Sequence, residues 1–376
     1  MKKQIVMPRT MDGYHLWTKT GEKRVPFAFD LEITSRCNNN CRHCYINRNA
    51  SDTKAEKNEL TLHEIKRIAD EAASLGSLWC TLTGGEPLLR DDFDGIYSFL
   101  KKRGFLVSVY TNATLVTEQH IELFKRYPPR NIEVSVYGVT EKTYEAITRK
   151  PGSFDLFNRG LDLLLRNGVK SQLKAMALRS NMHELEDIFN FCRRKTTDYF
   201  RFDPFLQMRV DQNLKKNKQI QLERLSPDEI AKIEREDPER ASAIRQVCKF
   251  IIQEPSFSVN NYLMRCSAGR TNFSVSCDAK FHLCSSLCHP TTLYDLRNGN
   301  LVDAWNNFVP RVLSLRSKRK EYSAKCGSCP IINLCFWCPA HAHLETGKMD
   351  LPVDYYCQNA KKRADYFGLT NSEKYK

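Results

Sequence analysis

The chain has 376 residues, 41% of them hydrophobic and 27% charged, which is typical of a globular protein with room for about two to three domains. Neither the first residues, MKKQIVMPRTMDG, nor any later stretch has the apolar run of a signal peptide or the roughly 18 apolar residues of a membrane span, so we expect a cytoplasmic protein without a membrane partner. The net charge of +14 suggests nucleic acid, but the basic runs at 214–219 and 316–320 lack interleaved aromatic residues, which favours a solvated surface or an acidic peptide partner instead.

Between residues 27 and 205, strand-like segments alternate with helical patterns. Strands are predicted at 27–34, 78–83, 106–111, 132–138, 173–178 and 199–205. The clearest helix follows the first strand, where Thr61 and Glu64 form a capping box and Gly76 suits the C-terminal cap. Six strand–helix units predict a parallel sheet, either open and doubly wound or a barrel, with ligands at the carboxyl ends of its strands.

The composition divides the chain into further parts. Residues 1–26 form an N-terminal segment, and 27–206 form the strand–helix domain. Residues 207–262 are polar and charged, which predicts a linker with short helices. Residues 263–360 hold nine of the fifteen cysteines and few long apolar runs, which predicts a small α+β domain held by ligands rather than by a large core; 361–376 are a tail.

Fifteen cysteines are unusual in a chain of this kind. Disulfide frameworks belong to small secreted domains, and the odd count also fits one poorly. In a reducing compartment, clustered cysteines indicate metal or cluster ligands. Scattered cysteines such as Cys80, Cys192 and Cys248 are expected to be small buried hydrophobic residues.

The first cysteine group directly follows the first predicted strand, in the stretch RCNNNCRHCY at 36–45, here called the cysteine loop. Its thiols are those of Cys37, Cys41 and Cys44, and there is no fourth cysteine nearby in the sequence. A structural zinc ion needs four ligands, so zinc would require a distant residue to complete the site. On a [4Fe–4S] cluster, three cysteines leave one iron open, which is what chemistry at a metal requires.

The second signal is TGGEP, at 83–87, where the second predicted strand ends. Paired glycines let the backbone approach a ligand closely, and a carboxylate at this place can pair with an ammonium group. Alone, GGEP is a weak turn motif. Here GGEP follows the strand that comes after C-x3-C-x2-C, and the two motifs together are far more specific than either motif alone.

Together the two motifs resemble those of radical S-adenosylmethionine (radical SAM) enzymes. The resemblance implies a partial (β/α)6 TIM-type barrel over residues 27–206 and a [4Fe–4S] cluster on Cys37, Cys41 and Cys44. It also implies that S-adenosylmethionine binds the open iron and is cleaved to a 5′-deoxyadenosyl radical. By position, the residues implied to bind S-adenosylmethionine are His43, Gly84, Gly85, Glu86, Pro87, Asn112, Ser135 and Arg149. The substrate base is not identified.

The second cysteine group resembles the SPASM extension of radical SAM enzymes, which holds up to two auxiliary [4Fe–4S] clusters. The five-residue gap between its two CxxC pairs is short for a zinc ribbon. The resemblance implies Cys266, Cys284 and Cys338 as ligands of the first auxiliary cluster, and Cys326, Cys329, Cys335 and Cys357 as ligands of the second.

This chain departs from the SPASM pattern in three places. The last cysteine spacing is one residue shorter than usual, Ala279 stands where glycine is common, and Asn272 stands where some members have a cysteine. The fourth ligand of the first auxiliary cluster is therefore open between Cys277, Cys288, a substrate group and none. His341 and His343 are expected to be structural.

The resemblance implies a radical SAM oxidoreductase that oxidatively modifies a peptide or protein, with auxiliary clusters accepting an electron. The alternatives are radical oxidation of a small molecule, such as an alcohol or a tetrapyrrole side chain, and an activity like that of anaerobic sulfatase maturases. A simple iron–sulfur electron carrier would need neither an open iron nor GGEP. The implied partners are an electron donor such as flavodoxin or ferredoxin and, because residues 1–26 are short for a recognition domain, a separate peptide-recognition protein or the barrel surface.

Overall fold

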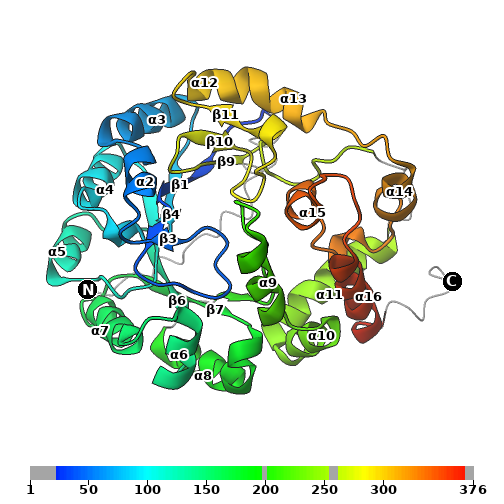
Figure 1. The fold of residues 1–376 in the computed structure, drawn as a ribbon, viewed down its shortest axis with the longest axis horizontal. Coiled ribbons are helices and arrows are strands. Elements are labelled where there is room, and N and C mark those ends of the chain that lie inside the picture. Colours follow the sequence, from blue (N-terminus) through cyan, green and yellow to red (C-terminus); the bar gives the residue numbers. More distant parts are fainter. Residues whose placement is uncertain (1–22, 197–200, 254–260, 369–376) are drawn as a thin grey trace, which may run out of the picture.

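The computed structural model describes residues 23–196, 201–253 and 261–368. Within these ranges one sheet of nine strands has the order β11-β10-β9-β1-β4-β5-β6-β7-β8 (Figure 1). Six of its strands are the predicted ones: β1 (Ala28–Thr34), β4 (Trp79–Gly84), β5 (Leu106–Thr111), β6 (Asn131–Val136), β7 (Ser171–Met176) and β8 (Arg201–Asp203). They all pair in parallel, which confirms the α/β partial barrel. Residues 199 and 200 of the sixth predicted strand lie outside the described residues.

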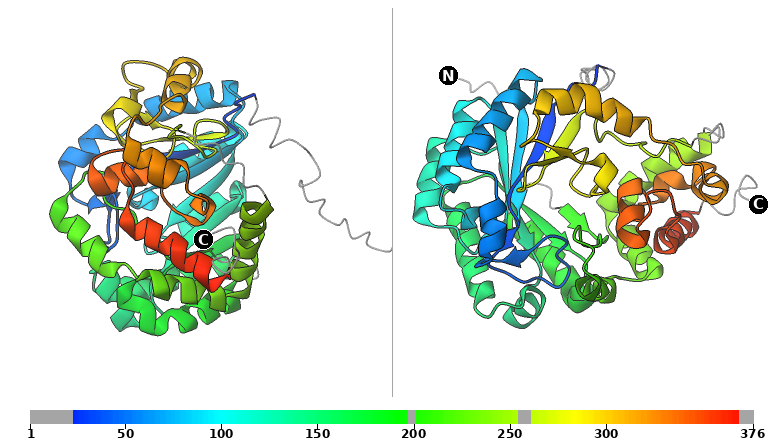
Figure 2. Two further views of the ribbon diagram at one scale, coloured as in Figure 1. Left: turned by 90° about the vertical axis from the view of Figure 1, so that its right-hand side faces the viewer. Right: turned by 45° about the horizontal axis from the view of Figure 1, so that its top comes forward.

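Helices cover the outer face of this sheet (Figures 1 and 2). The first of them begins as predicted, because Thr61 Oγ1 accepts a hydrogen bond from Glu64 N at 3.2 Å and Glu64 Oε2 accepts one from Thr61 N at 2.7 Å. Its buried stripe of Ile65, Ile68, Ala69 and Ala72 packs into the core. The outer helices are α3 (Leu62–Ser74), α4 (Phe93–Lys102), α5 (Glu118–Arg126), α6 (Glu141–Thr148), α7 (Ser153–Arg166) and α8 (Leu185–Lys195).

The cysteine loop is a side excursion from the carboxyl end of β1. Two short strands, β2 (Arg36–Cys37) and β3 (Arg48–Asn49), pair in parallel and close its base. A short helix, α2 (Thr53–Asn58), then leads the chain back toward α3. The loop therefore lies at the end of the sheet where ligands of parallel barrels bind.

Three helices follow the last barrel strand where a linker with short helices was expected: α9 (Leu214–Glu223), α10 (Pro227–Glu236) and α11 (Pro238–Gln253). They lie between the barrel and the C-terminal helices (Figure 1). The α10 helix packs on α16 (Asp354–Tyr366), where the buried Arg363 Nε donates to Glu234 Oε2 at 2.6 Å. Among the scattered cysteines, Cys80 and Cys192 are buried, and the side chain of Cys248 lies outside the described residues.

Part of the C-terminal region continues the barrel sheet, while a separate small hydrophobic cluster around Tyr322, Trp337 and Tyr356 packs its cysteine-rich end. Strand β9 (Asn272–Val275) pairs in parallel with β1, and β10 (Lys280–His282) and β11 (Tyr294–Asp295) extend the sheet in antiparallel fashion. The rings of Phe29 and Phe273 stack with centroids 5.3 Å apart, in the same hydrophobic core. This pairing covers the edge of β1, which would otherwise expose unpaired backbone groups.

The remaining helical segments of the C-terminal region are short, apart from the last helix. They are α12 (Leu301–Asp303), α13 (Val309–Leu313), α14 (Lys320–Tyr322) and α15 (Pro339–Thr346). Across the described part of the chain, no helix has the length and apolarity that crossing a bilayer requires.

Candidate functional site

The cysteine loop is anchored on several sides. Its backbone donates to the C-terminal end of α6, from Asn40 N to Thr148 O at 2.9 Å and from Arg42 N to Ile147 O at 3.1 Å. The buried Arg209 side chain donates from Nη1 to Cys44 O at 3.0 Å. The loop is thus held in one conformation by barrel and linker residues, as a ligand-bearing loop must be.

The three thiols of this loop are close neighbours in a largely dry setting. Burial raises the pKa of Cys37 and Cys41 well above the ordinary range of a thiol, and the neighbouring thiols raise it further. Metal coordination removes such protons outright, because a bound cation supplies the missing positive charge. The donor set therefore fits a metal group better than it fits three free thiols.

Among the described residues, no three Cys, His, Asp or Glu side chains come together closely enough for one metal ion. Three thiols bound to three different irons of a cubane stand further apart than ligands of one ion. The zinc alternative from the sequence therefore finds no assembled ligand set in the described part of the chain.

The two glycines of TGGEP are required by the packing of the cysteine loop. A Cβ added to Gly84, whose φ is +133°, would lie 2.1 Å from Thr34 O, and one added to Gly85 would lie 2.1 Å from Arg36 O. The end of β4 thus rests directly on the backbone that enters the loop. Close approach to a ligand was the expected reason for these glycines, and close approach to the loop backbone is a further one.

We expect Gly85→Ala to lower stability by about 1–3 kcal/mol and to displace the loop, because neither backbone can move without disturbing the sheet. The measurement is iron bound per chain after anaerobic reconstitution, together with the thermal midpoint. Gly95→Ala is the matched control, since its Cβ would meet nothing nearer than 3.8 Å. A Gly85→Ala protein with unchanged iron content and midpoint would contradict the packing argument.

Glu86 is fully buried and is not among the residues that line the cavity which the loop borders. Its carboxylate accepts hydrogen bonds from Thr111 Oγ1 at 2.7 Å, Asn112 N at 2.8 Å and Leu88 N at 3.2 Å. Burial raises its pKa to about 7, against the effect of these hydrogen bonds. Glu86 therefore ties the end of β4 to the end of β5.

A cavity of about 490 Å³, here called the reaction cavity, opens beside the cysteine loop inside the partial barrel. Besides the three loop cysteines, five residues expected to bind S-adenosylmethionine line it: His43, Gly84, Gly85, Asn112 and Ser135. Glu86, Pro87 and Arg149 are not among its lining residues. The structure thus brings together most of the predicted site.

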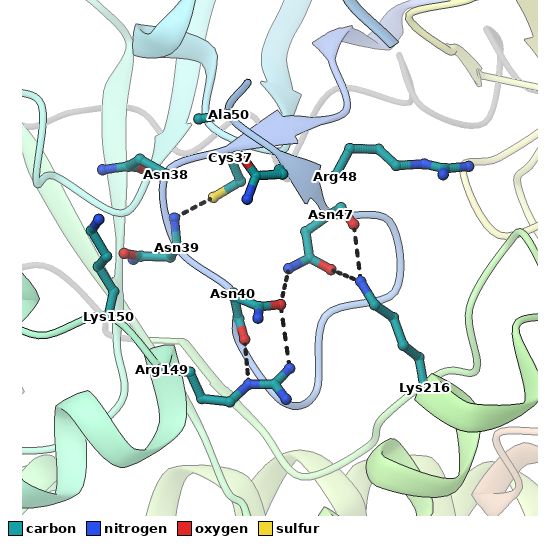
Figure 3. Close-up of a pocket in the computed structure, with 11 residues that line it drawn as sticks. Cys37, Asn38, Asn39, Asn40, Asn47, Arg48, Ala50, Arg149, Lys150 and Lys216 are labelled. Atoms are coloured by element: carbon teal, nitrogen blue, oxygen red, sulfur yellow. Dashed lines mark hydrogen bonds between the residues drawn. The ribbon is translucent and has the colours of Figure 1, made fainter. Parts of the chain in front are cut away.

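Arg149 lies on the other side of the cysteine loop, at a second pocket of about 480 Å³ (Figure 3). It ends α6 in a left-handed conformation, with φ of 52°. Its side chain donates from Nε to Asn40 O at 2.7 Å and from Nη1 to Gln219 Oε1 at 3.1 Å. Arg149 therefore fastens the loop to α9, while its expected contact with the cofactor has no support in its position.

Two polar side chains of the loop have buried atoms without a hydrogen-bond partner among the described residues. They are the Nδ1 atom of His43 and both amide atoms of Asn39. Burial lowers the pKa of His43 to about 3, so its ring is neutral, and it meets Tyr137 edge to face with centroids 4.9 Å apart. Since buried polar groups in native proteins are nearly always paired, these atoms fit a site completed by a bound polar group.

The far wall of the reaction cavity belongs to the C-terminal region. Ser285, Ser286, Phe336, His341 and Tyr356 line it opposite the cysteine loop. One chamber thus lies between the cysteine loop and the C-terminal region, although none of the described cysteines of the second group lines it. His341, expected to be structural, also borders this chamber.

Acidic residues of the cavity were missed at the sequence level. Asp30 and Glu32 are two residues apart on β1 and both line the cavity, as do Glu133 and Asp203. The signal was present in FDLE, since charged residues at alternate positions of a core strand face one side. Burial raises the pKa of Glu32 to about 8, and the charges of Asp30 and Asp278 raise it further.

This shift makes stability depend on pH. Glu32 has a pKa of about 8 in the fold against an ordinary value of 4.5, so the unfolded chain releases this proton first as pH rises. We expect stability to fall between about pH 4.5 and pH 8, by up to roughly 5 kcal/mol. Glu32→Gln should remove most of this slope and be the more stable protein at pH 8. A negatively charged cluster nearby would act in the same direction.

The thermal midpoint of both proteins between pH 5 and pH 8 tests this expectation. Glu118→Gln, at an exposed position of α5, is the control and should follow the parent. An equal pH dependence in the parent and in Glu32→Gln would show that Glu32 ionises normally.

The nine C-terminal cysteines include two groups of thiols that influence one another. Cys284 is a neighbour of Cys338 and Cys266. Cys326 is a neighbour of Cys357 and Cys329, and Cys335 adjoins the same three thiols. The proposed ligand sets from the sequence therefore lie together in space, three in one group and four in the other.

Residues 31–192 match the family described as the Radical SAM superfamily. The AdoMet-dependent heme synthase of Methanosarcina barkeri is 26% identical over 353 residues, which cover 88% of this chain and 96% of that protein. The antilisterial bacteriocin subtilosin biosynthesis protein AlbA of Bacillus subtilis is 26% identical over 189 residues, 50% of this chain and 41% of AlbA.

Solved structures share the fold. Streptococcus suis SuiB bound to precursor peptide SuiA matches with a TM-score of 0.66 and 16% identity, over 90% of this chain and 78% of SuiB. The structure of native anSMEcpe with bound AdoMet matches with a TM-score of 0.61 and 17% identity, over 91% of this chain and 97% of anSMEcpe. The cysteine-rich C-terminal region fits the SPASM extension. Residues 31–192 thus match the radical SAM superfamily, and the protein is an enzyme that uses S-adenosylmethionine and a [4Fe–4S] cluster.

Proposed function

We propose that this enzyme oxidises a side chain of a peptide or protein held in the reaction cavity. When bound, the cluster and S-adenosylmethionine supply a 5′-deoxyadenosyl radical that takes a hydrogen atom from the substrate. The observation that carries the proposal is the single chamber between the cysteine loop and the C-terminal wall of Phe336, His341 and Tyr356. A substrate in it meets the radical-forming site on one side and the auxiliary cysteines' region on the other.

The proposal gives separate roles to the cysteine loop, the cavity residues and the C-terminal cysteines. Cys37, Cys41 and Cys44 would hold the first cluster. His43, Asn112 and Ser135 line the cavity where they can position S-adenosylmethionine. The amino group of the cofactor would meet the backbone at 83–85, since the carboxylate of Glu86 is occupied by β5. The C-terminal cysteines would hold auxiliary clusters that take up the electron which a substrate radical must lose.

The charge of the cavity supports a peptide over an anionic small molecule. Asp30, Glu133 and Asp203 line it, and Glu32 does too, although its pKa of about 8 keeps it largely uncharged at neutral pH. Lys174 is the one Lys or Arg among the described residues that line it. A porphyrin with several propionate groups would bring like charges together in a poorly hydrated space. Neutral or cationic side chains of a peptide would not be repelled by these carboxylates. SuiB, which shares this fold, has been solved bound to precursor peptide SuiA, and this supports the proposal.

A second candidate is oxidation of a tetrapyrrole side chain. It is favoured by the similarity to the Methanosarcina barkeri heme synthase, which extends over 88% of this chain. At 26% identity this similarity does not carry the substrate over. The two candidates share the radical chemistry and differ in what enters the cavity.

One series of assays tests both. The protein is reconstituted anaerobically, and release of 5′-deoxyadenosine from S-adenosylmethionine is measured after reduction. Co-expression with peptides encoded beside its gene then shows whether a peptide loses two hydrogen atoms by mass spectrometry. Fe-coproporphyrin III serves as the tetrapyrrole probe and should remain unchanged. If the porphyrin is converted and all peptides remain unmodified, the peptide proposal is wrong and the second candidate is supported.

We further propose that an acidic electron donor docks at the pocket of Figure 3, on the solvent side of the cysteine loop. Arg48 and Lys150 are exposed at this pocket, and Lys216 also lines it. Opposite charges speed the encounter of redox partners and act more weakly in salt.

Accordingly, Arg48→Glu combined with Lys150→Glu should slow S-adenosylmethionine cleavage driven by reduced flavodoxin. Cleavage driven by dithionite should be unchanged, because a small reductant needs no docking surface. Lys125→Glu combined with Arg126→Glu, on the outer helix α5, is the charge-matched control. Equal losses with both reductants would point to damage at the loop and not to docking.

A further inference from the structure

The first auxiliary cysteine group lacks an assigned fourth ligand. Cys266, Cys284 and Cys338 come from three separate segments, and Cys284 is the member with both others as neighbours. Asn272, where some SPASM domains have a cysteine, is the first residue of β9 and is paired with Ala28 of β1. The choice therefore lies between other cysteines and an open iron.

Cys277 is turned toward the barrel. It follows β9, and its carbonyl accepts a hydrogen bond from Leu60 N at 2.7 Å. The side chains that act on its thiol are Ser35, Glu32, Glu59 and Asp278, with no other thiol among them. Its backbone joins the C-terminal region to the barrel, and Cys284 is not among the groups that act on its thiol.

Cys288 lies on the same short loop as Cys284. A turn brings them together, with Leu287 N donating to Cys284 O at 3.0 Å. The Sγ atom of Cys288 lies 3.4 Å from Ser285 O and 3.9 Å from Nδ1 of the buried His282. Cys284 is among the groups that act on the Cys288 thiol, together with Glu32 and Asp278, and it is not among those that act on the Cys277 thiol.

The sequence spacing agrees with this placement. Cys284 and Cys288 are separated by three residues, as are Cys37 and Cys41 in the first cysteine loop. A short loop of this length can wrap one cluster with two thiols. The pairing of β10 with β9 fixes the point at which the loop with Cys284 and Cys288 leaves the sheet.

We propose that Cys288 is the fourth ligand of the first auxiliary cluster, together with Cys266, Cys284 and Cys338. The inference rests on the proposed function to the extent that these three cysteines hold a cluster. It makes both auxiliary clusters fully ligated by protein thiols. The first auxiliary cluster then exchanges electrons with the substrate and does not bind it through an open iron.

The test removes the radical-forming cluster so that only auxiliary iron is observed. The parent is the full-length C37A/C41A/C44A protein, reconstituted anaerobically and then oxidised mildly with ferricyanide. A [4Fe–4S] cluster with an iron that lacks a protein ligand loses that iron readily and gives the EPR signal of a [3Fe–4S] cluster. We compare the parent with added Cys288→Ala, Cys288→Ser or Cys277→Ala, measuring EPR spectra and iron per chain.

We expect little [3Fe–4S] signal in the parent and in the Cys277→Ala protein. In the Cys288→Ala protein the signal should appear, or about four irons per chain should be lost if the whole cluster is released. Cys288→Ser keeps the size of the side chain and should show the same change if alanine disturbs folding.

Two results would overturn the proposal. One is a [3Fe–4S] signal already present in the parent and unchanged by replacing Cys288, which means an open iron. The other is a change caused by Cys277→Ala and not by Cys288→Ala, which makes Cys277 the ligand. A parent that binds no auxiliary iron would refute the auxiliary clusters of the proposed function, and Cys288 with them. Absence of turnover by the intact enzyme would refute only the proposed function.

Discussion

The C37A/C41A/C44A protein is expected to release no 5′-deoxyadenosine from S-adenosylmethionine, while the auxiliary clusters remain bound. These thiols are the only cysteines of the reaction cavity wall among the described residues, and the loop that carries them is fixed by α6 and Arg209. Without them no open iron is presented to the cofactor. The measurement is 5′-deoxyadenosine after reduction with dithionite, read together with iron content.

The control separates loss of ligands from loss of cysteines in general. Cys80 and Cys192 are both buried in the barrel core, away from the cavity wall. The double variant C80A/C192A should lose some stability, as buried thiols do when truncated, and keep its rate of cleavage. Cleavage that persists in the triple variant would refute the assignment of the first cluster.

The second large effect is expected at the four-cysteine group of the C-terminal region. Cys329→Ala should leave cleavage of S-adenosylmethionine in place and stop formation of oxidised product. Cys329 belongs to the group with Cys326, Cys335 and Cys357, which lies outside the loop that would hold the first cluster. A substrate radical that cannot pass on its electron returns to starting material or is lost in side reactions.

The ratio of oxidised product to 5′-deoxyadenosine checks this prediction. It should approach zero in Cys329→Ala while the amount of 5′-deoxyadenosine remains close to that of the parent. Ser328→Ala, at the exposed neighbouring position, is the control and should leave the ratio unchanged. A Cys329→Ala protein with an unchanged ratio would remove the second auxiliary cluster from the oxidation.

Most of the barrel was predictable because its determinants are local. The six strands are marked by β-branched and aromatic runs, and Thr61 with Glu64 signals a helix start that needs no tertiary information. The cysteine loop was predictable for a related reason, since its ligands lie within eight residues. The short spacing of the three cysteines indicates a cluster site, and their position directly after the first strand places that site at the end of β1.

The features that could not be predicted from the sequence depend on contacts between residues far apart in the chain. Strand β9 joins β1 from more than two hundred residues away, and its short NFSV run has no feature that names its partner. Position also decides the roles of Glu86 and Arg149. Both match the motifs of the family, but Glu86 is held by β5 and Arg149 by Asn40. Side-chain direction at a motif is set by neighbours that the motif does not contain.

The pairing of β9 with β1 has a consequence for electron transfer. The strand that leads into the cysteine loop is hydrogen-bonded to the strand that leads toward Cys284 and Cys288. Tunnelling rates fall steeply with distance, so a hinge between the two metal-binding regions would make oxidation irregular from one turnover to the next. Here no hinge is available at this point, because both regions are built on one continuous sheet. The sheet therefore sets the separation between the clusters that the cysteine loop and the loop with Cys284 and Cys288 would hold.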